Sequence, residues 1–386
     1  NKNFNLNNNL YQKIQNLDYV NKIEIAKAGF INIFFDEKFL IDKLSDVIKE
    51  ENNYGQNDLG QESNVNIEFV SANPTGPIHI AHIRGAVYGD VLANILEKTG
   101  HKVTREFYVN DAGSQITILG NSLYKRYQQL RGKKIDLDDG EYPGKYLIKI
   151  AENISSKDKD KWLSKDEGIR NKYFRDYAVK EILNSIKNDL EEIDIYFDKL
   201  SFETQIIKQN KIVEVIKILK KKDLLYEGTL EKPKGEELRD WEPRRQLLFR
   251  SSNFNDDRDR SFQKANGDWT YFANDVAYHY DKITRNFNQL INIWGADHIG
   301  YIKRMESIVD VISNKKNFLD IRICQIVRLL KNDQVLKMSK REGIFVTLRE
   351  IFNLVGKDSL RYYMISTKNE TSIDFDVNKV IEKNKN

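Results

Sequence analysis

Cysteine is almost missing from this sequence of 386 residues, since Cys324 is the single one. One cysteine excludes an internal disulfide and a zinc site built from several thiolates, and it fits a reducing compartment. Long hydrophobic runs are also missing: no stretch of about 18 consecutive apolar residues occurs, so no membrane span is expected. The opening residues NKNFN lack the charged-then-apolar layout of a secretion signal. We therefore expect a cytoplasmic protein.

A large excess of charge of one sign is lacking as well, because the formal net charge is only +4. Binding of nucleic acid would then depend on local basic patches, such as residues 220–222 or 337–341, rather than on overall charge. The length allows two or three domains. The chain begins with asparagine and ends without an obvious domain boundary, which suggests a fragment of a longer protein.

The distribution of apolar and polar residues predicts three regions. Residues 1–60 combine a short helical pattern with two strand-like runs and end in a polar linker, which indicates a small α+β domain. Residues 61–325 indicate a larger α/β domain with a charged, mainly helical insertion at about 117–198. Residues 326–386 hold a basic loop followed by amphipathic helix.

A strand, a loop, a helix and a second strand follow one another early in the second region. Apolar residues alternate over 65–70, and the segment 71–77 then breaks the pattern with proline and glycine. Apolar residues at three- and four-residue spacing follow until Gly100, and 103–109 again alternates. This is a βαβ unit, which predicts a parallel sheet.

Sheet-like segments resume at 267–272 and at 290–295. The simplest arrangement is a nucleotide-binding fold that is split by the helical insertion.

Two short segments far apart in the chain carry the chemistry. His79 and His82 lie at the expected start of the helix, where the helix dipole favours negative charge and imidazoles can donate to phosphate oxygens. Lys337 and Lys340, with Ser339 between them, lie on the basic loop. Together they predict a site for a nucleoside triphosphate, with the histidines facing the phosphate under attack and the lysines the leaving group.

The segment 68–113 resembles class I aminoacyl-tRNA synthetases, and within them arginyl-tRNA synthetase. Four further segments are similar to the same family: 241–244, 271–279, 295–301 and 325–363. The resemblance extends from about residue 20 to the end. It implies a split Rossmann-like catalytic domain with a helical insertion, a small α+β N-terminal domain that binds tRNA, here incomplete, and a C-terminal helical stem that precedes an anticodon-binding domain.

The family's reaction joins ATP and arginine to arginyl-adenylate and then transfers the arginyl group to the arginine tRNA. By resemblance, His79 and His82 match the two histidines of the His-x-Gly-His motif and are expected to act on the α-phosphate. Lys337 and Lys340 match the lysines of the Lys-Met-Ser-Lys motif and are expected to neutralise the β- and γ-phosphates, while Ser339 bonds phosphate. Catalysis would come from positioning and charge stabilisation.

Three more residues are expected at the ATP. Ala81 stands where the family usually has glycine, beside the adenine ring, and its methyl group would crowd the base. Asp297 and His298 lie at the end of an expected strand and are expected to contact ribose or amino acid. Magnesium is expected only as Mg-ATP, without a tightly bound metal.

Recognition of arginine requires planar, charged acceptors for the guanidinium group. By resemblance, Tyr271 and Asp275 bind the arginine side chain, and Glu203 is a third acceptor. Asn73 would hold the α-amino group, and Glu68 would shape its pocket. Glu68 and Asn73 flank the end of the first strand, where open α/β sheets place ligands.

Two other functions stay open. The first alternative is another class I synthetase or a small nucleotidyltransferase with the same histidine pair, although a nucleotidyltransferase would not need the lysine loop. The second alternative is a synthetase-like module that binds RNA or a partner without catalysis. The preferred function implies arginine tRNA, L-arginine and ATP as partners of a monomer. By resemblance, activation would need bound tRNA, and a fragment is expected to aminoacylate poorly.

Overall fold

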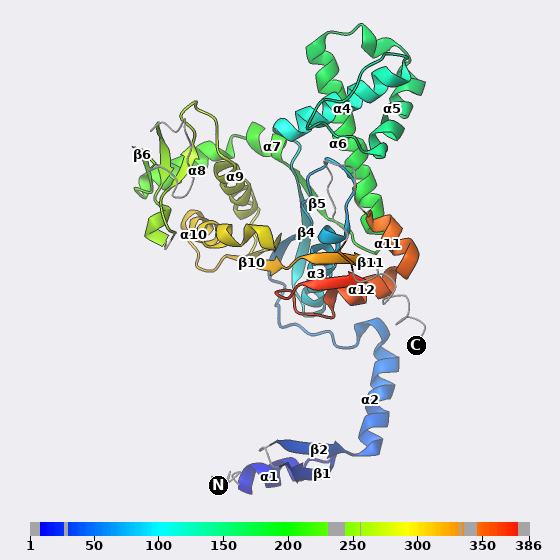
Figure 1. Ribbon diagram of the computed structural model, residues 1–386. Coiled ribbons are helices and arrows are strands. Elements are labelled where there is room, and N and C mark those ends of the chain that lie inside the picture. Colours follow the sequence, from blue (N-terminus) through cyan, green and yellow to red (C-terminus); the bar gives the residue numbers. More distant parts are fainter. Residues whose placement is uncertain are drawn as a thin grey trace. The chain divides into compact units, whose positions relative to one another are not determined.

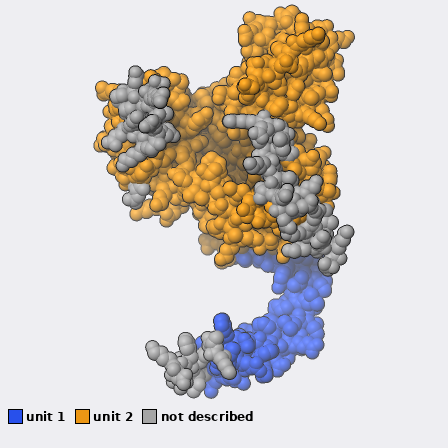
Figure 2. Space-filling model, viewed as in Figure 1, with its two compact units in different colours: residues 1–58 blue, residues 59–386 orange. Residues whose placement is uncertain are grey.

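The computed structural model describes most of the chain, namely residues 8–26, 30–230, 244–254, 256–331, 334–335 and 346–376. The chain divides into two compact units, residues 1–58 and 59–386 (Figure 2). The boundary between them falls inside the polar run expected as a linker. Among these described residues, no helix is both long and apolar enough to cross a membrane.

Unit 1 is a small α+β arrangement. Its elements are α1 (Asn8–Gln15), β1 (Val20–Ile25), β2 (Ile31–Phe35), α2 (Glu37–Glu50) and the short 3-10 helix η1 (Glu51–Asn53). β1 and β2 pair antiparallel, which confirms the two strands predicted there. α2 begins at Asp36, whose carboxylate accepts from the Lys38 N–H at 2.9 Å as an N-cap.

A five-stranded parallel sheet lies at the centre of unit 2 (Figure 1). In spatial order its strands are β10 (Leu319–Cys324), β9 (Gln289–Gly295), β3 (Asn64–Glu68), β4 (Lys102–Val109) and β5 (Lys199–Phe202). All neighbouring strands are parallel. The first strand of the sheet therefore lies in its middle, and the strand order reverses between β3 and β9. This is the Rossmann-like order, and the predicted parallel sheet is confirmed.

Helices cover both faces of this sheet, and each face has its own core. One core joins the sheet to α3 (Ile80–Lys98), and the other joins it to α9 (Tyr271–Thr284) and α10 (Ile302–Ser313). Neighbouring residues of β9 contribute to opposite cores, since Leu290 belongs to the second and Ile291 to the first. Burial on both faces is typical of parallel strands, which explains why these segments read as apolar runs.

The insertion between β4 and β5 is helical, as predicted. It contains α4 (Ser114–Leu130), α5 (Lys145–Asp158), the 3-10 helix η2 (Lys161–Leu163) and α6 (Glu167–Glu191). A Cβ atom at Gly120 on α4 would lie 3.0 Å from the Arg175 backbone on α6. Glycine therefore permits the close approach of these two helices.

A second excursion, between β5 and α9, was not foreseen. It contains α7 (Glu203–Lys208), α8 (Lys211–Lys221), η3 (Ser251–Phe254) and an antiparallel sheet of β6 (Leu225–Thr229), β7 (Arg245–Phe249) and β8 (Arg260–Gln263). The strand predicted at 267–272 is wrong, because Tyr271 and Phe272 open α9. The Thr270 side chain accepts from the Ala273 N–H at 3.2 Å, and this cap starts a helix there.

The C-terminal region contains the predicted helices and an additional small sheet. Its elements are β11 (Val327–Lys331), β12 (Gln334–Val335), α11 (Leu348–Val355), α12 (Lys357–Ile365) and β13 (Ile373–Asp376). β13 returns to pair parallel with β11. The expectation of helix alone missed this strand, whose Ile373 and Phe375 are buried.

Arg84 fastens α3 to this C-terminal region. Its buried guanidinium donates to the backbone oxygens of Gln325 (3.0 Å), Thr371 (2.6 Å) and Lys368 (2.7 Å). Buried carbonyl groups need donors, and one guanidinium supplies several in a fixed plane. The helix that carries the two histidines is thus joined to the segment that follows α12.

The contact between β3 and α3 leads to a test of stability. A Cβ atom on Gly89 would lie 2.4 Å from Cγ of the fully buried Phe69, whereas one on Gly85, in the same helix, would meet only Ile293 Cγ2 at 3.8 Å. We expect Gly89→Ala to lower the free energy of unfolding by about 1–3 kcal/mol through overpacking. Gly85→Ala should leave it unchanged or raise it by up to about 1 kcal/mol, since alanine favours helix. Urea denaturation measures both, and equal effects of the two substitutions would contradict this packing.

Candidate active site

The two histidines lie at the carboxyl end of β3, at the start of α3. His79 has an extended backbone (φ −127°, ψ 174°) and precedes the first helical residue. Its N–H donates to His82 Nδ1 at 3.4 Å, and the two ring centroids are 4.1 Å apart. Ala81, the residue where the family resemblance leads us to expect glycine, is exposed between them. The first-turn N–H groups and both imidazoles form a place where a phosphate group is favoured.

Residues that follow the lysine segment in the chain contact the histidine segment. Three predicted phosphate-binding residues lie outside the described part of the chain: Lys337, Ser339 and Lys340. Beyond them, Thr347 forms an antiparallel bridge with His79, and the Leu348 N–H donates to the Ile78 oxygen at 3.1 Å. Residues distant in sequence, on either side of the insertions, are therefore adjacent at this point.

Three of the predicted arginine-binding residues line one cavity of about 140 Å³. They are Asn73 from the loop after β3, Glu203 from the start of α7 and Tyr271 from the start of α9. The Asn73 amide donates to Gln115 Oε1 on α4 at 3.3 Å. The tertiary structure thus brings together residues that span about half of the chain.

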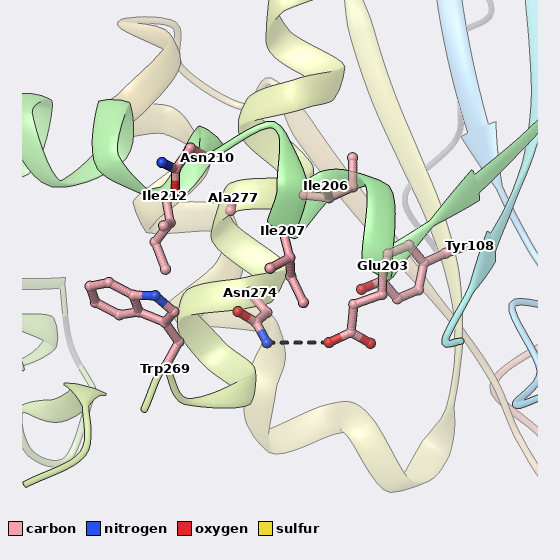
Figure 3. Close-up of a pocket in the computed structure, with 9 residues that line it drawn as sticks. All are labelled: Tyr108, Glu203, Ile206, Ile207, Asn210, Ile212, Trp269, Asn274 and Ala277. Carbon is pink, nitrogen blue, oxygen red and sulfur yellow. Dashed lines mark hydrogen bonds between the residues drawn. The ribbon is translucent and has the colours of Figure 1, made fainter. Parts of the chain in front are cut away.

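Glu203 is buried and held from several sides. The Asn274 amide donates to Oε1 at 3.2 Å (Figure 3), and the Asn110 amide, in the orientation that satisfies its hydrogen bonds, donates to Oε2 at 2.7 Å. Asp111 accepts from the Thr204 N–H at 2.9 Å and so fixes the first turn of α7. Burial raises the pKa of Glu203, while hydrogen bonds from Tyr108 and Asn274 act against the rise.

Glu203 also lines a second, smaller cavity of about 40 Å³ (Figure 3). Its wall is largely apolar and includes Ile206, Ile207, Ile212 and Trp269. A carboxylate next to such a wall is poorly solvated. A cationic partner in the larger cavity would therefore strongly stabilise its charged form.

Asp275 lies one helical turn after Tyr271 in α9. Its Oδ2 accepts from the Tyr301 hydroxyl at 3.1 Å. Burial raises the pKa of the Asp275 carboxyl to about 7; the Tyr301 hydrogen bond opposes this rise, and the charges of Glu68 and Glu203 add to it. Three carboxylates therefore lie close enough to repel one another, which favours a bound cation.

Glu68, at the end of β3, is engaged within the protein. Its Oε2 accepts from Lys282 Nζ at 2.5 Å and its Oε1 from the Ser71 hydroxyl at 2.9 Å. Its expected role in shaping the arginine pocket stays a prediction.

Asp297 and His298 lie beyond the end of β9, on the 3-10 helix η4 (Ala296–Tyr301). Both side chains are exposed, and His298 Nε2 lies 3.4 Å from Asp297 Oδ2. They stand across the switch point from β3, where doubly wound sheets bind ligands. Their contact with ATP stays a prediction. Within the described ranges no group of three or more His, Cys, Asp or Glu side chains is arranged to hold a metal ion.

Sequence reasoning did not single out the polar residues that contact these carboxylates. They are Tyr108, Asn110, Asn274 and Tyr301. A signal was available for all four, since Asn274 and Tyr301 lie within the segments 271–279 and 295–301, and Tyr108 and Asn110 within 68–113, all of which carry the family resemblance. Tyr108 lies near the end of β4 and Asn110 just after it, and the parallel strands β3 and β4 end at the same edge of the sheet.

Paired histidines at a helix start, together with a cavity lined by residues that follow β3, β4 and β5 of a doubly wound sheet, define a Rossmann-like nucleotide-binding catalytic domain. A family model described as tRNA synthetases class I (R), catalytic domain, matches residues 43–383. The chain belongs to this family, and the resemblance seen in its motifs is confirmed.

Individual relatives agree with the family. An arginine–tRNA ligase of Ruegeria pomeroyi is 43% identical over 366 residues, which cover 95% of this chain and 63% of that protein. One from Wolbachia pipientis is 44% identical over 376 residues, 97% of this chain and 66% of that protein. The chain thus spans less than two thirds of the length of these curated relatives.

Solved structures show the same fold. A structure titled putative arginyl-tRNA synthetase from Campylobacter jejuni matches with a TM-score of 0.77 and 32% identity, covering 89% of this chain and 72% of that one. Arginyl-tRNA synthetase of Thermus thermophilus matches with a TM-score of 0.64 at 14% identity, covering 95% of this chain and 67% of that one. This second likeness concerns the fold alone.

The Asp275 carboxyl should titrate near pH 7 in the absence of ligand. Tyr301→Phe should move its pKa higher, because the hydrogen bond that favours the carboxylate is lost. NMR of ¹³C-labelled aspartate measures the titration, and Asp275→Asn identifies the signal by its disappearance. An Asp275 carboxyl that titrates below about pH 5, closer to the ordinary aspartate range, would contradict the description of this pocket.

Proposed function

We propose that this chain is the catalytic part of an arginine–tRNA ligase. The observation that carries the proposal is the cluster of Glu68, Glu203 and Asp275, which come from the end of β3, from the start of α7 and from α9, because an acidic pocket favours a cationic side chain. The relatives named arginine–tRNA ligase support the same function. The reaction would be ATP-dependent formation of arginyl-adenylate, followed by transfer to arginine tRNA.

Arginine would bind with its guanidinium group between Glu203 and Asp275, with Tyr271 at the rim. A planar guanidinium can donate to both carboxylates at once, whereas the compact ammonium of lysine cannot match both. Asn73 would accept from the α-amino group, and Glu68 would keep that end of the pocket in shape. The substrate carboxylate would then face the start of α3.

In the first step, an oxygen of the arginine carboxylate attacks the α-phosphorus of ATP, and the bond to the bridging oxygen of pyrophosphate breaks. His79 and His82 would donate to the α-phosphate oxygens as negative charge grows on them. Lys337, Lys340 and Ser339 would bind the departing pyrophosphate. Mg²⁺ would arrive with ATP and neutralise phosphate charge.

The remaining contacts and partners belong to the same proposal. Ala81 would lie beside the adenine ring, and Asp297 and His298 beside the ribose. Residues 1–60 would contact tRNA, 61–325 would form the catalytic domain and 326–386 the lysine loop and stem. The enzyme would act as a cytoplasmic monomer on L-arginine, ATP and arginine tRNA.

Amino-acid specificity tests the function. Calorimetry should show binding of ATP and, among the amino acids, of arginine with clear preference over lysine. ATP–pyrophosphate exchange should depend on arginine and on added tRNA. Exchange with a different amino acid would indicate another class I synthetase, and the absence of both ATP and arginine binding would indicate a module without catalysis.

Asp275→Ala should separate arginine binding from ATP binding. Removing one carboxylate partner of a buried charge pair costs about 2–5 kcal/mol, so the arginine dissociation constant should rise at least about thirtyfold. The ATP dissociation constant should change far less. Calorimetry measures both, with Asp176→Ala, an exposed carboxylate of α6 paired with Lys172, as the control. Equal weakening of arginine and ATP binding would refute the assignment of Asp275.

A further inference from the structure

A fully buried lysine lies beneath the candidate arginine pocket. Lys282, near the end of α9, donates to Glu68 Oε2 at 2.5 Å and to Asn292 Oδ1 at 3.0 Å. Its Nζ also lies 4.6 Å from the centre of the Tyr278 ring. A buried ammonium group is costly unless it is paired and hydrogen-bonded, and here each of these groups compensates it. The proposed chemistry assigns Lys282 no role.

One set of contacts leads from Lys282 to a strained turn after β3. Glu68 accepts from the Ser71 hydroxyl at 2.9 Å, and the same hydroxyl oxygen accepts from the Tyr108 N–H at 3.0 Å. Val70 and Ser71 have φ values of +67° and +37°. The Ser71 N–H donates to the Phe69 oxygen at 2.9 Å, which closes a three-residue turn around Val70.

This turn needs support from its surroundings. A positive φ is a genuine outlier for a β-branched residue such as valine, and strain of this kind persists only where neighbouring groups hold it in place. Only Ala72 separates this turn from Asn73, whose backbone oxygen accepts from the Thr75 N–H at 2.7 Å. The orientation of Asn73 therefore depends on the Glu68–Ser71 contact.

A second set of contacts leads from Lys282 back into α9. Because Lys282 occupies the oxygen of the Asn292 amide, the amide nitrogen faces His279 Nε2 at 2.9 Å and donates to it. His279 Nδ1 then donates to the Asp275 backbone oxygen at 2.7 Å. Burial lowers the pKa of His279 to about 4, with the charge of Lys282 adding to the effect, so the ring is neutral and its tautomer is determined.

We propose that Lys282 is a positioning residue for arginine. Through Glu68 its ammonium group orients the turn that precedes Asn73, and through Asn292 it orients the helical turn that carries Asp275. Lys282 thereby places the contacts for both ends of the amino acid without touching it. The inference rests on the proposed function, since it assigns Asn73 and Asp275 to arginine.

Lys282→Met tests the inference, because methionine has a similar length and no charge. The substitution leaves Glu68 without its ion pair and allows the Asn292 amide to turn over. We expect the arginine dissociation constant to rise at least about tenfold, a change of about 1.4 kcal/mol. The ATP dissociation constant should change less than about threefold, since the histidine helix is not part of this network.

Two further variants separate positioning from general stability. Lys172→Met removes an exposed lysine of α6 that is paired with Asp176, and it should leave both dissociation constants unchanged. Ser71→Ala interrupts the first set of contacts without leaving a buried charge. Ser71→Ala should raise the arginine dissociation constant several-fold while the melting temperature changes little. If Lys282→Met does not fold, this variant tests the inference in its place.

The outcomes are distinct. A selective loss of arginine binding in Lys282→Met or, where that variant does not fold, in Ser71→Ala supports the inference. Arginine and ATP binding weakened in the same ratio, or arginine binding unchanged, overturns it and leaves Lys282 a structural ion pair. If the parent chain binds ATP but no arginine, the proposed function itself fails, and this inference fails with it.

Discussion

The position of β3 in the middle of the sheet is the constraint on which the rest of unit 2 depends. Its neighbours β4 and β9 are reached by connections on opposite sides, so a crevice opens where their carboxyl ends diverge. Glu68 ends β3, Asn73 and the two histidines follow in the next loop and the first turn of α3, and α9 and η4 precede and follow β9 in the chain. A single strand order therefore brings the helix start with the two histidines and the cavity with Glu203 to the same edge of the sheet.

The buried carboxylates near this crevice have opposite electrostatic roles. Burial disfavours ionisation of Glu106, but the charges of Lys282 and Arg285 outweigh it and lower its pKa to about 2. At Asp275 the Tyr301 hydrogen bond and the charge of Lys282 do not outweigh burial, and its pKa is raised to about 7. A carboxylate satisfied within the protein maintains the structure, whereas one that lacks a close cation is suited to receive one from a ligand.

Much of the fold was predictable because its signals are local. Alternation over 65–70 and 103–109 with helical spacing between them specified the βαβ unit, and these segments are β3, α3 and β4. The prediction of a strand at 267–272 failed because an aromatic-rich run is ambiguous until a cap is recognised, and Thr270 provides one. β13 was missed because a four-residue strand is defined mainly by its partner β11.

The sequence by itself named the candidate residues, namely the histidine pair and the lysine loop from their motifs and the arginine contacts from the family resemblance, because both signals are properties of short segments. The tertiary structure alone decided how the described residues among them are held. Lys282 and Glu68 are 214 residues apart, and their ion pair exists only because α9 packs where β3 ends. Long-range hydrogen bonds leave no local pattern, since their geometry arises from packing of the whole domain.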